Sequence, residues 1–223
     1  MFNINDTLDS RALRATDCFG QRFMRAGTYH YNVLPTGGGV VNTERPHTLV
    51  VQDRKSDGKM NQHDVSLRWD GRSWHPDQKD LVIEAGDLVV WNCPDQSAPP
   101  FEVAGDKAFF GSGTLVNECG YSHAFGLPGT YAWGDALGSN VGGVVRVKAV
   151  DCKTHADLAH WRAALAKAAL VMVQGGKAEP SEVEVMVGQT VYFAIVAGKG
   201  ITVTDKRLIG MTGSDDCQPK KAA

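Results

Sequence analysis

The sequence predicts an all-β protein that contains two β-sandwiches. Twenty-five glycines among 223 residues accompany an aromatic content of 8% and many short runs rich in Val, Thr and Tyr. This composition is typical of short strands joined by tight turns. Two stretches of the chain also recur elsewhere in it. With 43% hydrophobic residues, a chain of this length can bury two cores of about a hundred residues each.

Short apolar segments separated by turn residues predict the strands of the central part of the chain. Typical separators are Asp70-Gly71 and Leu127-Pro128-Gly129, which favour turns. The predicted strands span residues 65–69, 81–84, 88–92, 101–103, 121–125, 129–133 and 143–150. Their number and spacing indicate a Greek-key sandwich, which we assign to residues 62–150.

One helix interrupts this series and is predicted at residues 154–168. Thr154 and Asp157 form a capping-box pattern at its start, which is an N-terminal helix signal. Leu158, Trp161 and Leu165 then share one face of the helix. The β pattern resumes after it, with strands predicted at residues 170–173, 183–187, 191–196 and 201–204.

The internal repeat decides the predicted domain organisation. Residues 81–91 are echoed by residues 183–193, and residues 121–133 are echoed by residues 19–31. In the terminal copy the second motif therefore precedes the first. We interpret this order as a circular permutation, in which residues 1–53 and 168–212 together build the second sandwich and residues 154–168 form the linking helix.

The permutation also predicts an assembly. Half a sandwich alone exposes an apolar face and open strand edges, so the two terminal pieces are expected to pair with each other. They can pair within one chain or by exchange between chains, and exchange builds a homo-oligomer. We therefore expect protein partners, foremost further copies of the chain.

Three motifs in residues 81–147 resemble those of a known family. They are Glu84-Ala85-Gly86-Asp87, Tyr121-Ser122-His123-Ala124-Phe125 and Pro128-Gly129-Thr130-Tyr131. In order and spacing this region is similar to the cupredoxins, the small blue-copper proteins such as plastocyanin, amicyanin and halocyanin. The resemblance implies a Greek-key sandwich with a copper site of two His, one Cys and a weak axial Met.

The residues at the expected copper ligand positions cannot hold copper in that way. Aligned with the family, the four positions carry Phe101, Asp135, Gly138 and Val141. The corresponding positions of the permuted copy lie near Val33, Thr36, Gly39, Gly200 and Ile201. A type 1 copper centre requires a thiolate and imidazoles in fixed geometry, so we expect no such centre and no cofactor.

Two cysteines suggest an alternative metal site. Cys93 and Cys119 are both expected at the end of the sandwich where copper would sit, with His123 or Asp135 in support. Such a set can bind zinc or copper(I), and the two thiols can cycle as a disulfide. Packing of two small buried thiols is the other interpretation, and His123 also fits an ordinary strand residue.

The remaining histidines do not form a metal-binding pattern. His63 and His75 lack the i, i+2 or i, i+4 spacing of a shared metal site and are interpreted as surface residues. His47 stands alone in the sequence.

These observations lead to one function hypothesis and two alternatives. We expect a metal-free binding or assembly protein, such as a scaffold, a subunit of a larger complex or a carrier that uses the vacated end for recognition. A cytosolic metal-handling or redox protein with the unorthodox Cys and His site is the first alternative. An enzyme with a small-molecule pocket near Phe101 and Trp133 is the second, because fold does not fix function.

Charge and segment composition exclude other classes. The formal net charge is -2, and the basic residues are not clustered, so nucleic acid is not an expected partner. No segment is apolar and long enough to span a bilayer. The start of the chain lacks the apolar core of a secretory signal, and the five cysteines are an odd number at unrelated spacings. We expect a cytoplasmic protein, or a periplasmic one if a signal peptide has been removed.

Overall fold

The computed structural model describes residues 7–36, 44–55, 58–106 and 110–209. The described chain is mostly β with one short helix, which confirms the predicted all-β class. The strands of its first part are β1 (Asp17–Arg22), β2 (Gly27–Pro35), β3 (His47–Gln52), β4 (Gln62–Trp69), β5 (Trp74–Pro76), β6 (Asp80–Glu84), β7 (Leu88–Asn92) and β8 (Phe101–Gly105). The later elements are β9 (Cys119–Ala124), β10 (Gly129–Gly134), β11 (Gly142–Lys148), α1 (His155–Leu165), β12 (Ala169–Gln174), β13 (Lys177–Glu179), β14 (Glu182–Met186), β15 (Thr190–Ala197) and β16 (Thr204–Asp205).

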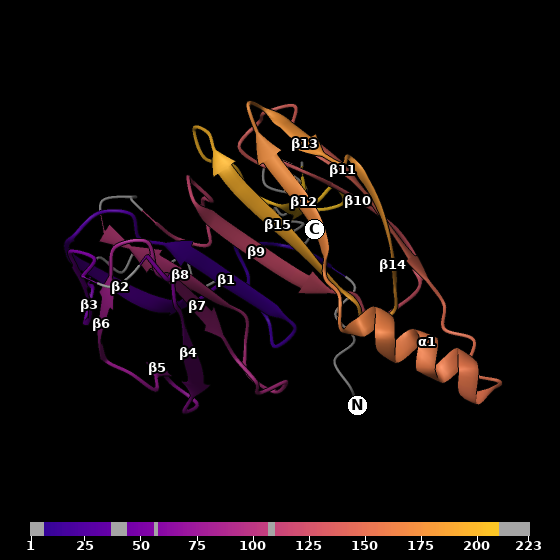
Figure 1. Cartoon of the computed structure of the whole chain (residues 1–223), viewed down its shortest axis with the longest axis horizontal. Helices are drawn as coiled ribbons and strands as arrows, with labels where there is room; N and C mark the ends of the chain where they lie inside the picture. Colours follow the sequence, from indigo (N-terminus) through magenta and orange to yellow (C-terminus); the bar gives the residue numbers. More distant parts are fainter. Residues whose placement is uncertain (1–6, 37–43, 56–57, 107–109, 210–223) are drawn as a thin grey trace, which may run out of the picture.

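The strands form one large sheet and two small ones. The large sheet has eight strands in the order β13-β12-β15-β9-β1-β7-β4-β5. The small sheets have four strands each, in the orders β6-β3-β2-β8 and β14-β11-β10-β16. The first small sheet thus contains only strands from the N-terminal part and the second only strands from the C-terminal part. Figure 1 shows the two parts side by side, in indigo to magenta and in orange to yellow.

In each part, aromatic rings join the small sheet to the large one. Tyr31 of β2 contacts Trp91 of β7 edge to face, with ring centroids 5.4 Å apart and planes at 71°. Trp133 of β10 contacts Phe193 of β15 in the same way, at 5.1 Å and 73°. All four rings are buried. We therefore name β1–β8 the N-terminal sandwich and β9–β16 the C-terminal sandwich.

The two sandwiches are direct repeats, which corrects the predicted permutation. Residues 19–31 and 81–91 belong to the N-terminal sandwich, and their counterparts 121–133 and 183–193 lie 102 positions further along in the C-terminal one. The two motifs thus have the same order in both copies. Even a local detail recurs: the Tyr29 hydroxyl donates to the carbonyl of the residue four positions before it, and so does the Tyr131 hydroxyl.

The predicted ranges 62–150 and 1–53 plus 168–212 therefore do not follow the strand pairing. In the structure β6 pairs with β3, and β7 pairs with β1 and β4. The prediction joined the motifs that are nearest along the chain. However, β3 and β6 are parallel, as are β4 and β7, and parallel pairs require long connections. Both sandwiches close within one chain, so closing the second sandwich does not require exchange between chains.

Residues 9–13, which precede β1, cover the edges of both small sheets. Asp9 forms a bridge with Thr204 of β16, and Leu13 forms one with Phe101 of β8. The backbone N–H of Ser10 also donates to the Val203 carbonyl at 3.0 Å. Covering an open edge protects it from pairing with another chain.

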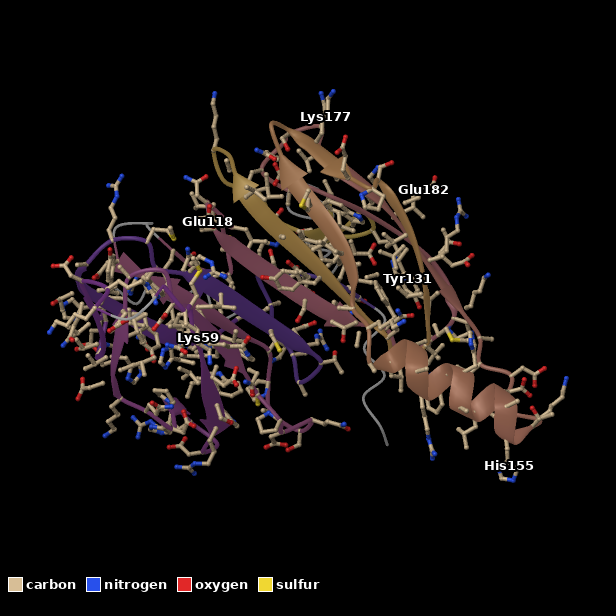
Figure 2. The ribbon with its side chains drawn as sticks, in the orientation of Figure 1. Lys59, Glu118, Tyr131, His155, Lys177 and Glu182 are labelled. Atoms are coloured by element: carbon tan, nitrogen blue, oxygen red, sulfur yellow. The ribbon has the colours of Figure 1, made fainter. Side chains whose placement is uncertain are left out.

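The helix begins as predicted and is shorter than the predicted range 154–168. The Thr154 side chain accepts a hydrogen bond from the Asp157 backbone N–H, and the Asp157 side chain accepts one from the Thr154 N–H, which confirms the capping box. No residue of the helix is buried, although the Trp161 indole donates to the Val187 carbonyl at 2.9 Å. Figure 2 shows His155 at the end of the helix that points away from the sheets. In the described ranges, no helix is long and apolar enough to cross a membrane.

Candidate functional site

The four predicted ligand positions belong to different sandwiches. Phe101 begins β8 of the N-terminal sandwich and packs on Trp74, with ring centroids 5.0 Å apart. Asp135, Gly138 and Val141 lie in the connection between β10 and β11 of the C-terminal sandwich. They were expected together because residues 62–150 were taken as one sandwich, and the strand pairing removes that premise.

Asp135 organises its own loop. Its carboxylate is buried and accepts hydrogen bonds from the backbone N–H groups of Thr202, Leu137 and Ser139 at 2.8, 3.0 and 3.2 Å. Burial by itself raises the pKa of Asp135, but these donors outweigh it and lower the pKa. Gly138 occupies the turn with a φ of 93°, a conformation that glycine adopts without strain. The carboxylate therefore acts as a structural acceptor.

Cys93 and Cys119 are at different places on the large sheet. Cys93 follows Asn92, which pairs with Cys18 of β1, whereas Cys119 pairs with Gln21 on the other side of the same strand. Cys18 and Gln21 are three positions apart along β1, which is about 10 Å at the rise of a strand. The two cysteines therefore lie at different heights and on opposite sides of β1.

The chemistry of these thiols is that of buried side chains. Burial raises the pKa of Cys119 to about 12, and the pKa of Cys93 is also raised by burial, so neither is a thiolate at neutral pH. The Cys119 Sγ donates to the Val116 carbonyl at 2.8 Å. In the described part of the chain, no three His, Cys, Asp or Glu side chains are grouped so that they could hold a metal ion.

His123 is part of a buried polar cluster at the seam between the sandwiches. Its Nδ1 lies 2.6 Å from the Asp17 carboxylate, and the Tyr121 hydroxyl donates to the same carboxylate at 3.3 Å. The exposed fraction of the side chain is 0% for His123 and 1% for Asp17. Asp17 belongs to β1 and His123 to β9, directly opposite each other. The cluster therefore joins the two sandwiches and has no access for a ligand.

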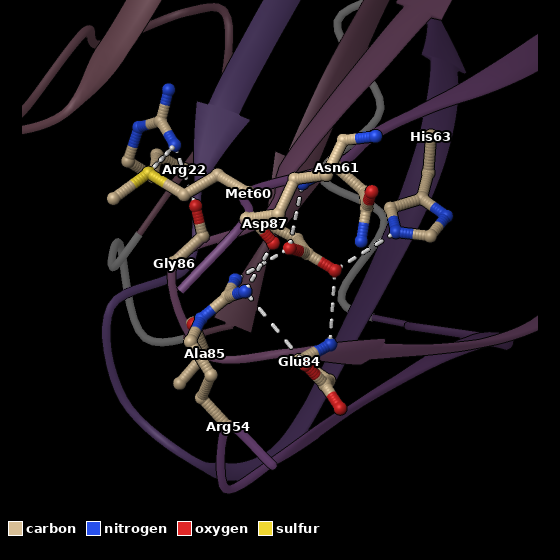
Figure 3. A network of polar contacts seen from close by, with 10 residues as sticks. Arg22, Arg54, Met60, Asn61, His63, Glu84, Ala85, Gly86 and Asp87 are labelled. Carbon is tan, nitrogen blue, oxygen red and sulfur yellow. Dashed lines mark hydrogen bonds and ion pairs between the residues drawn. The ribbon is translucent and has the colours of Figure 1, made fainter. Parts of the chain in front are cut away.

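A second polar network surrounds Asp87, in the turn between β6 and β7 (Figure 3). The carboxylate is 2.6 Å from Arg54 Nη2 and 3.0 Å from His63 Nε2. It also accepts hydrogen bonds from the backbone N–H groups of Asn61 and Glu84 at 3.0 and 3.1 Å. His63, expected at the surface, is thus a partner of a buried acid, with 28% of its side chain exposed.

The repeat shows that the Asp87 network is structural. Gln189 holds the position of Asp87 in the C-terminal sandwich, and its Oε1 accepts a hydrogen bond from the Met186 N–H at 3.0 Å. Asp87 accepts the same bond from Glu84, which is the counterpart of Met186. The Gln189 amide and the Asp87 carboxylate therefore close equivalent turns in the two copies.

The strongest candidate site is a pocket at one end of the N-terminal sandwich. Its volume is about 420 Å³, within the range of small-molecule sites. It lies between the end of β2, the start of β3 and the β4–β5 hairpin. The described residues that line it are Asn32, Val33, Leu34, Pro35, Glu44, Pro46, His47, Arg72, Ser73, Trp74, His75 and Lys79.

Two of the positions that the sequence aligns with copper ligands are at or near this pocket. Val33, a counterpart of the predicted ligand positions, lines it. Phe101, the predicted first-ligand position, packs behind the pocket wall on the ring of Trp74. The wall is continuous with the aromatic core, because Trp74 also contacts Trp69 at 5.3 Å.

Two polar atoms in the wall have no hydrogen-bond partner among the described residues. They are Nδ1 of His47 and Nε1 of Trp74. His47 is 8% exposed and Trp74 4%. A buried donor or acceptor without a partner costs about 1–3 kcal/mol. A polar ligand, after a small adjustment of these side chains, would supply the missing partners.

His47 is uncharged at neutral pH. Burial lowers its pKa, and the nearby His75 and Lys79 lower it further, while Asp80 acts weakly in the opposite direction. A neutral imidazole presents one donor and one acceptor, so His47 can hydrogen bond to either kind of ligand group.

Sequence reasoning missed His47 and Trp74. The sequence pattern predicts an isolated residue at His47 and a surface residue at His75, and it gives no sign of a role for Trp74. One signal was present: His47 has the same strand phase as Leu49 and Val51, and alternate residues of a strand point to one face. That phase places the imidazole on the inner face of β3.

The C-terminal sandwich lacks the counterpart of His47. His47 pairs with Tyr31, and Gly143 pairs with Trp133, the counterpart of Tyr31. Gly143 thus stands in the place of His47. A Cβ atom at Gly143 would lie 2.2 Å from the Ser181 carbonyl oxygen, so no side chain fits there.

Trp74 is also specific to the N-terminal sandwich. Pro76 pairs with Leu67 and Ala178 pairs with Val173, at matching places on the two edge hairpins. Trp74 pairs with Trp69 further along the first hairpin, whereas the second hairpin already turns at Gly175 and Gly176 and has no strand position for a counterpart of Trp74. The repeat has therefore kept the strands in both copies, while the second copy has no counterpart of the His47 and Trp74 side chains.

Comparisons of the chain with models of known protein families, with curated proteins and with solved structures find no match. The site is consequently interpreted from its own geometry.

Proposed function

We propose that this chain is a metal-free, cupredoxin-like binding protein that holds a small molecule in the pocket beside His47 and Trp74. The observation that carries this proposal is a pocket wall with two buried, unpartnered polar atoms. Nearly all buried polar groups are hydrogen bonded. Atoms of core residues such as Trp91 and Thr204 also lack a partner among the described residues, but His47 and Trp74 both line one pocket.

The comparison between the repeats supports the proposal. The second copy has Gly143 where the first has His47, and its shorter edge hairpin has no strand position for Trp74, yet it folds with the same strand order in its small sheet. The imidazole and indole are therefore not required by the fold. Polar and aromatic side chains that a fold does not require are typical of recognition.

The cupredoxin-like part of the proposal is supported by the sequence motifs and by the two-layered β structure. The absence of type 1 copper stays a prediction from the sequence alignment, because the strand pairing divides the aligned positions between the two sandwiches. Titration of the purified protein with Cu(II), followed by visible absorption, tests it: we expect no intense blue band. A blue band with one copper ion bound per chain would contradict the proposal.

Ligand binding is tested by nuclear magnetic resonance of the 15N-labelled protein. The Trp74 indole N–H signal is identified by its loss in the Trp74→Phe variant. A library of small fragments is then added, and we expect a subset to shift the Trp74 signal. The Trp161 indole on the exposed helix is the internal control and should not move. If no fragment shifts the Trp74 signal selectively, the pocket is not a binding site.

A further inference from the structure

The charges around the pocket indicate which ligands it takes. Of the described lining residues, Arg72 and Lys79 are basic and Glu44 is acidic. Neither Arg72 nor Lys79 forms an ion pair in the described ranges. In the described chain neither cation is thus held in an ion pair, although Glu44 lines the same pocket and Asp80 directly follows Lys79.

The acid nearest to Arg72 along the chain is already engaged. The Asp70 carboxylate is 2.7 Å from His75 Nε2, and it accepts the backbone N–H groups of Ser73 and Arg72 at 2.7 and 2.8 Å. These three contacts close the turn of the β4–β5 hairpin and hold it beside the pocket. The Arg72 guanidinium is left available for a ligand.

The apolar part of the lining is on the opposite strands. Leu34 and Pro35 at the end of β2, and Pro46 just before β3, are the apolar contributors there. A ligand that fills the pocket therefore meets the Arg72 cation from the hairpin side and hydrocarbon from the β2–β3 side. Lys79 is next to β3, where its carbonyl accepts a hydrogen bond from the Thr48 N–H at 3.2 Å.

We propose that the ligand is a small organic anion, with a carboxylate or phosphate group bound by Arg72 and Lys79 and an apolar body packed on Leu34, Pro35 and Pro46. This inference rests on the proposed function and names its ligand class. Arginine is well suited to planar or tetrahedral anionic oxygen groups. An anion also offsets the positive charge of the two side chains at the pocket.

The test uses matched probes and the Trp74 indole signal. Benzoate and phenyl phosphate are the anionic probes, and benzamide has the shape of benzoate without its charge. We expect both anions to shift the signal with dissociation constants of about 1 mM or tighter, and benzamide to bind at least about tenfold more weakly. Binding of the anions should weaken as salt is added, because ions screen charge at an open site.

Two charge-neutralising variants provide the second measurement. Arg72→Gln and Lys79→Gln are each expected to weaken benzoate binding about tenfold and to leave benzamide binding unchanged. Arg146→Gln, on the exposed face of the C-terminal sandwich, is the matched control and should bind benzoate like the unmodified protein. Comparison of benzoate with phenyl phosphate distinguishes a carboxylate site from a phosphate site.

The outcomes separate the two proposals. Equal binding of benzamide and benzoate, or full benzoate binding by both variants, overturns the anion proposal while the pocket remains a binding site. Failure of every anionic and neutral fragment to shift the Trp74 signal overturns both.

Discussion

Phe19 of β1 lies directly opposite Tyr121 of β9 in the large sheet, and these two residues are counterparts in the repeat. The next pairs are reciprocal: Cys18 is opposite Ser122, and Gly20 is opposite Gly120. Such reciprocity is the property of a twofold interface, in which one patch pairs with its own copy. The chain is therefore built like a dimer whose two subunits have been joined into one polypeptide.

This relationship predicts that the two sandwiches will associate when the chain is cut between them. Ser112 donates to the Val103 carbonyl in the N-terminal sandwich, and Leu115 bridges Ile201 in the C-terminal one. A cut between Gly113 and Thr114 should thus leave both cores intact. We expect fragments 1–113 and 114–223, when co-expressed, to form a one-to-one complex in sedimentation velocity.

The control for this experiment acts on the seam itself. Gly20→Pro in the first fragment removes a backbone donor from β1, which lies between two strands, and proline is not tolerated in a central strand. The complex should be lost with this variant. Separate sedimentation of the unmodified fragments would show that the seam does not hold the halves together.

The buried pair of Asp17 and His123 should contribute strongly to stability. His123→Ala removes the closest side-chain partner of the buried Asp17 carboxylate, which keeps the Tyr121 hydroxyl and the Arg14 N–H as donors, and we expect a cost of about 1–3 kcal/mol. Urea unfolding measures the change. Arg146→Ala breaks a cross-strand pair with Glu182 whose side chains are 51% and 59% exposed, and its cost should be below about 1 kcal/mol. Equal effects of the two variants would contradict this assignment.

Asp87 should make the stability depend on acid pH. Burial alone raises its pKa, but the Asn61 N–H, His63, the Glu84 N–H and Arg54 together hold the pKa well below its usual value. The unfolded chain has a pKa of about 3.9 at this group. The stabilising contribution is therefore complete above that pH, and it is lost as the pH falls through the depressed folded-state value.

The measurement compares the unmodified protein with Asp87→Asn across this range. The difference in free energy of unfolding should be constant at neutral pH and shrink as the pH falls below about 4. Asp151→Asn, whose side chain is 63% exposed, is the control and should show little difference at any pH. A constant difference for Asp87→Asn down to low pH would refute the assigned role.

Gly143 should be intolerant of any side chain. A Cβ atom there would lie 2.2 Å from a backbone oxygen and 3.0 Å from the Trp133 indole nitrogen, so we expect Gly143→Ala to destabilise the protein by about 1–3 kcal/mol or more. Gly198→Ala is the matched control, since nothing lies within 4 Å of its Cβ position. Thermal unfolding of both variants measures the loss of stability. If Gly143→Ala were as stable as the unmodified protein, the second copy would have room for a counterpart of His47.

Much of the local structure could be predicted from the sequence. The strands around Leu81, Leu88 and Gly129 and the capping box at Thr154 follow from short-range patterns. The repeat was also visible, but its two equal offsets of 102 residues, which indicate a direct repeat, were interpreted as a permutation. The pocket was not predicted, because it combines β2, β3 and a hairpin whose proximity depends on non-local pairing.

The sequence by itself determined which segments become strands and where they turn. Those properties depend on alternation, turn residues and side-chain chemistry, which act over a few residues. Tertiary structure alone decided that β1 joins β9, and that His47, Trp74 and Arg72 line one pocket. Parallel pairing across long connections depends on packing of the whole sheet, and therefore no local pattern encodes it.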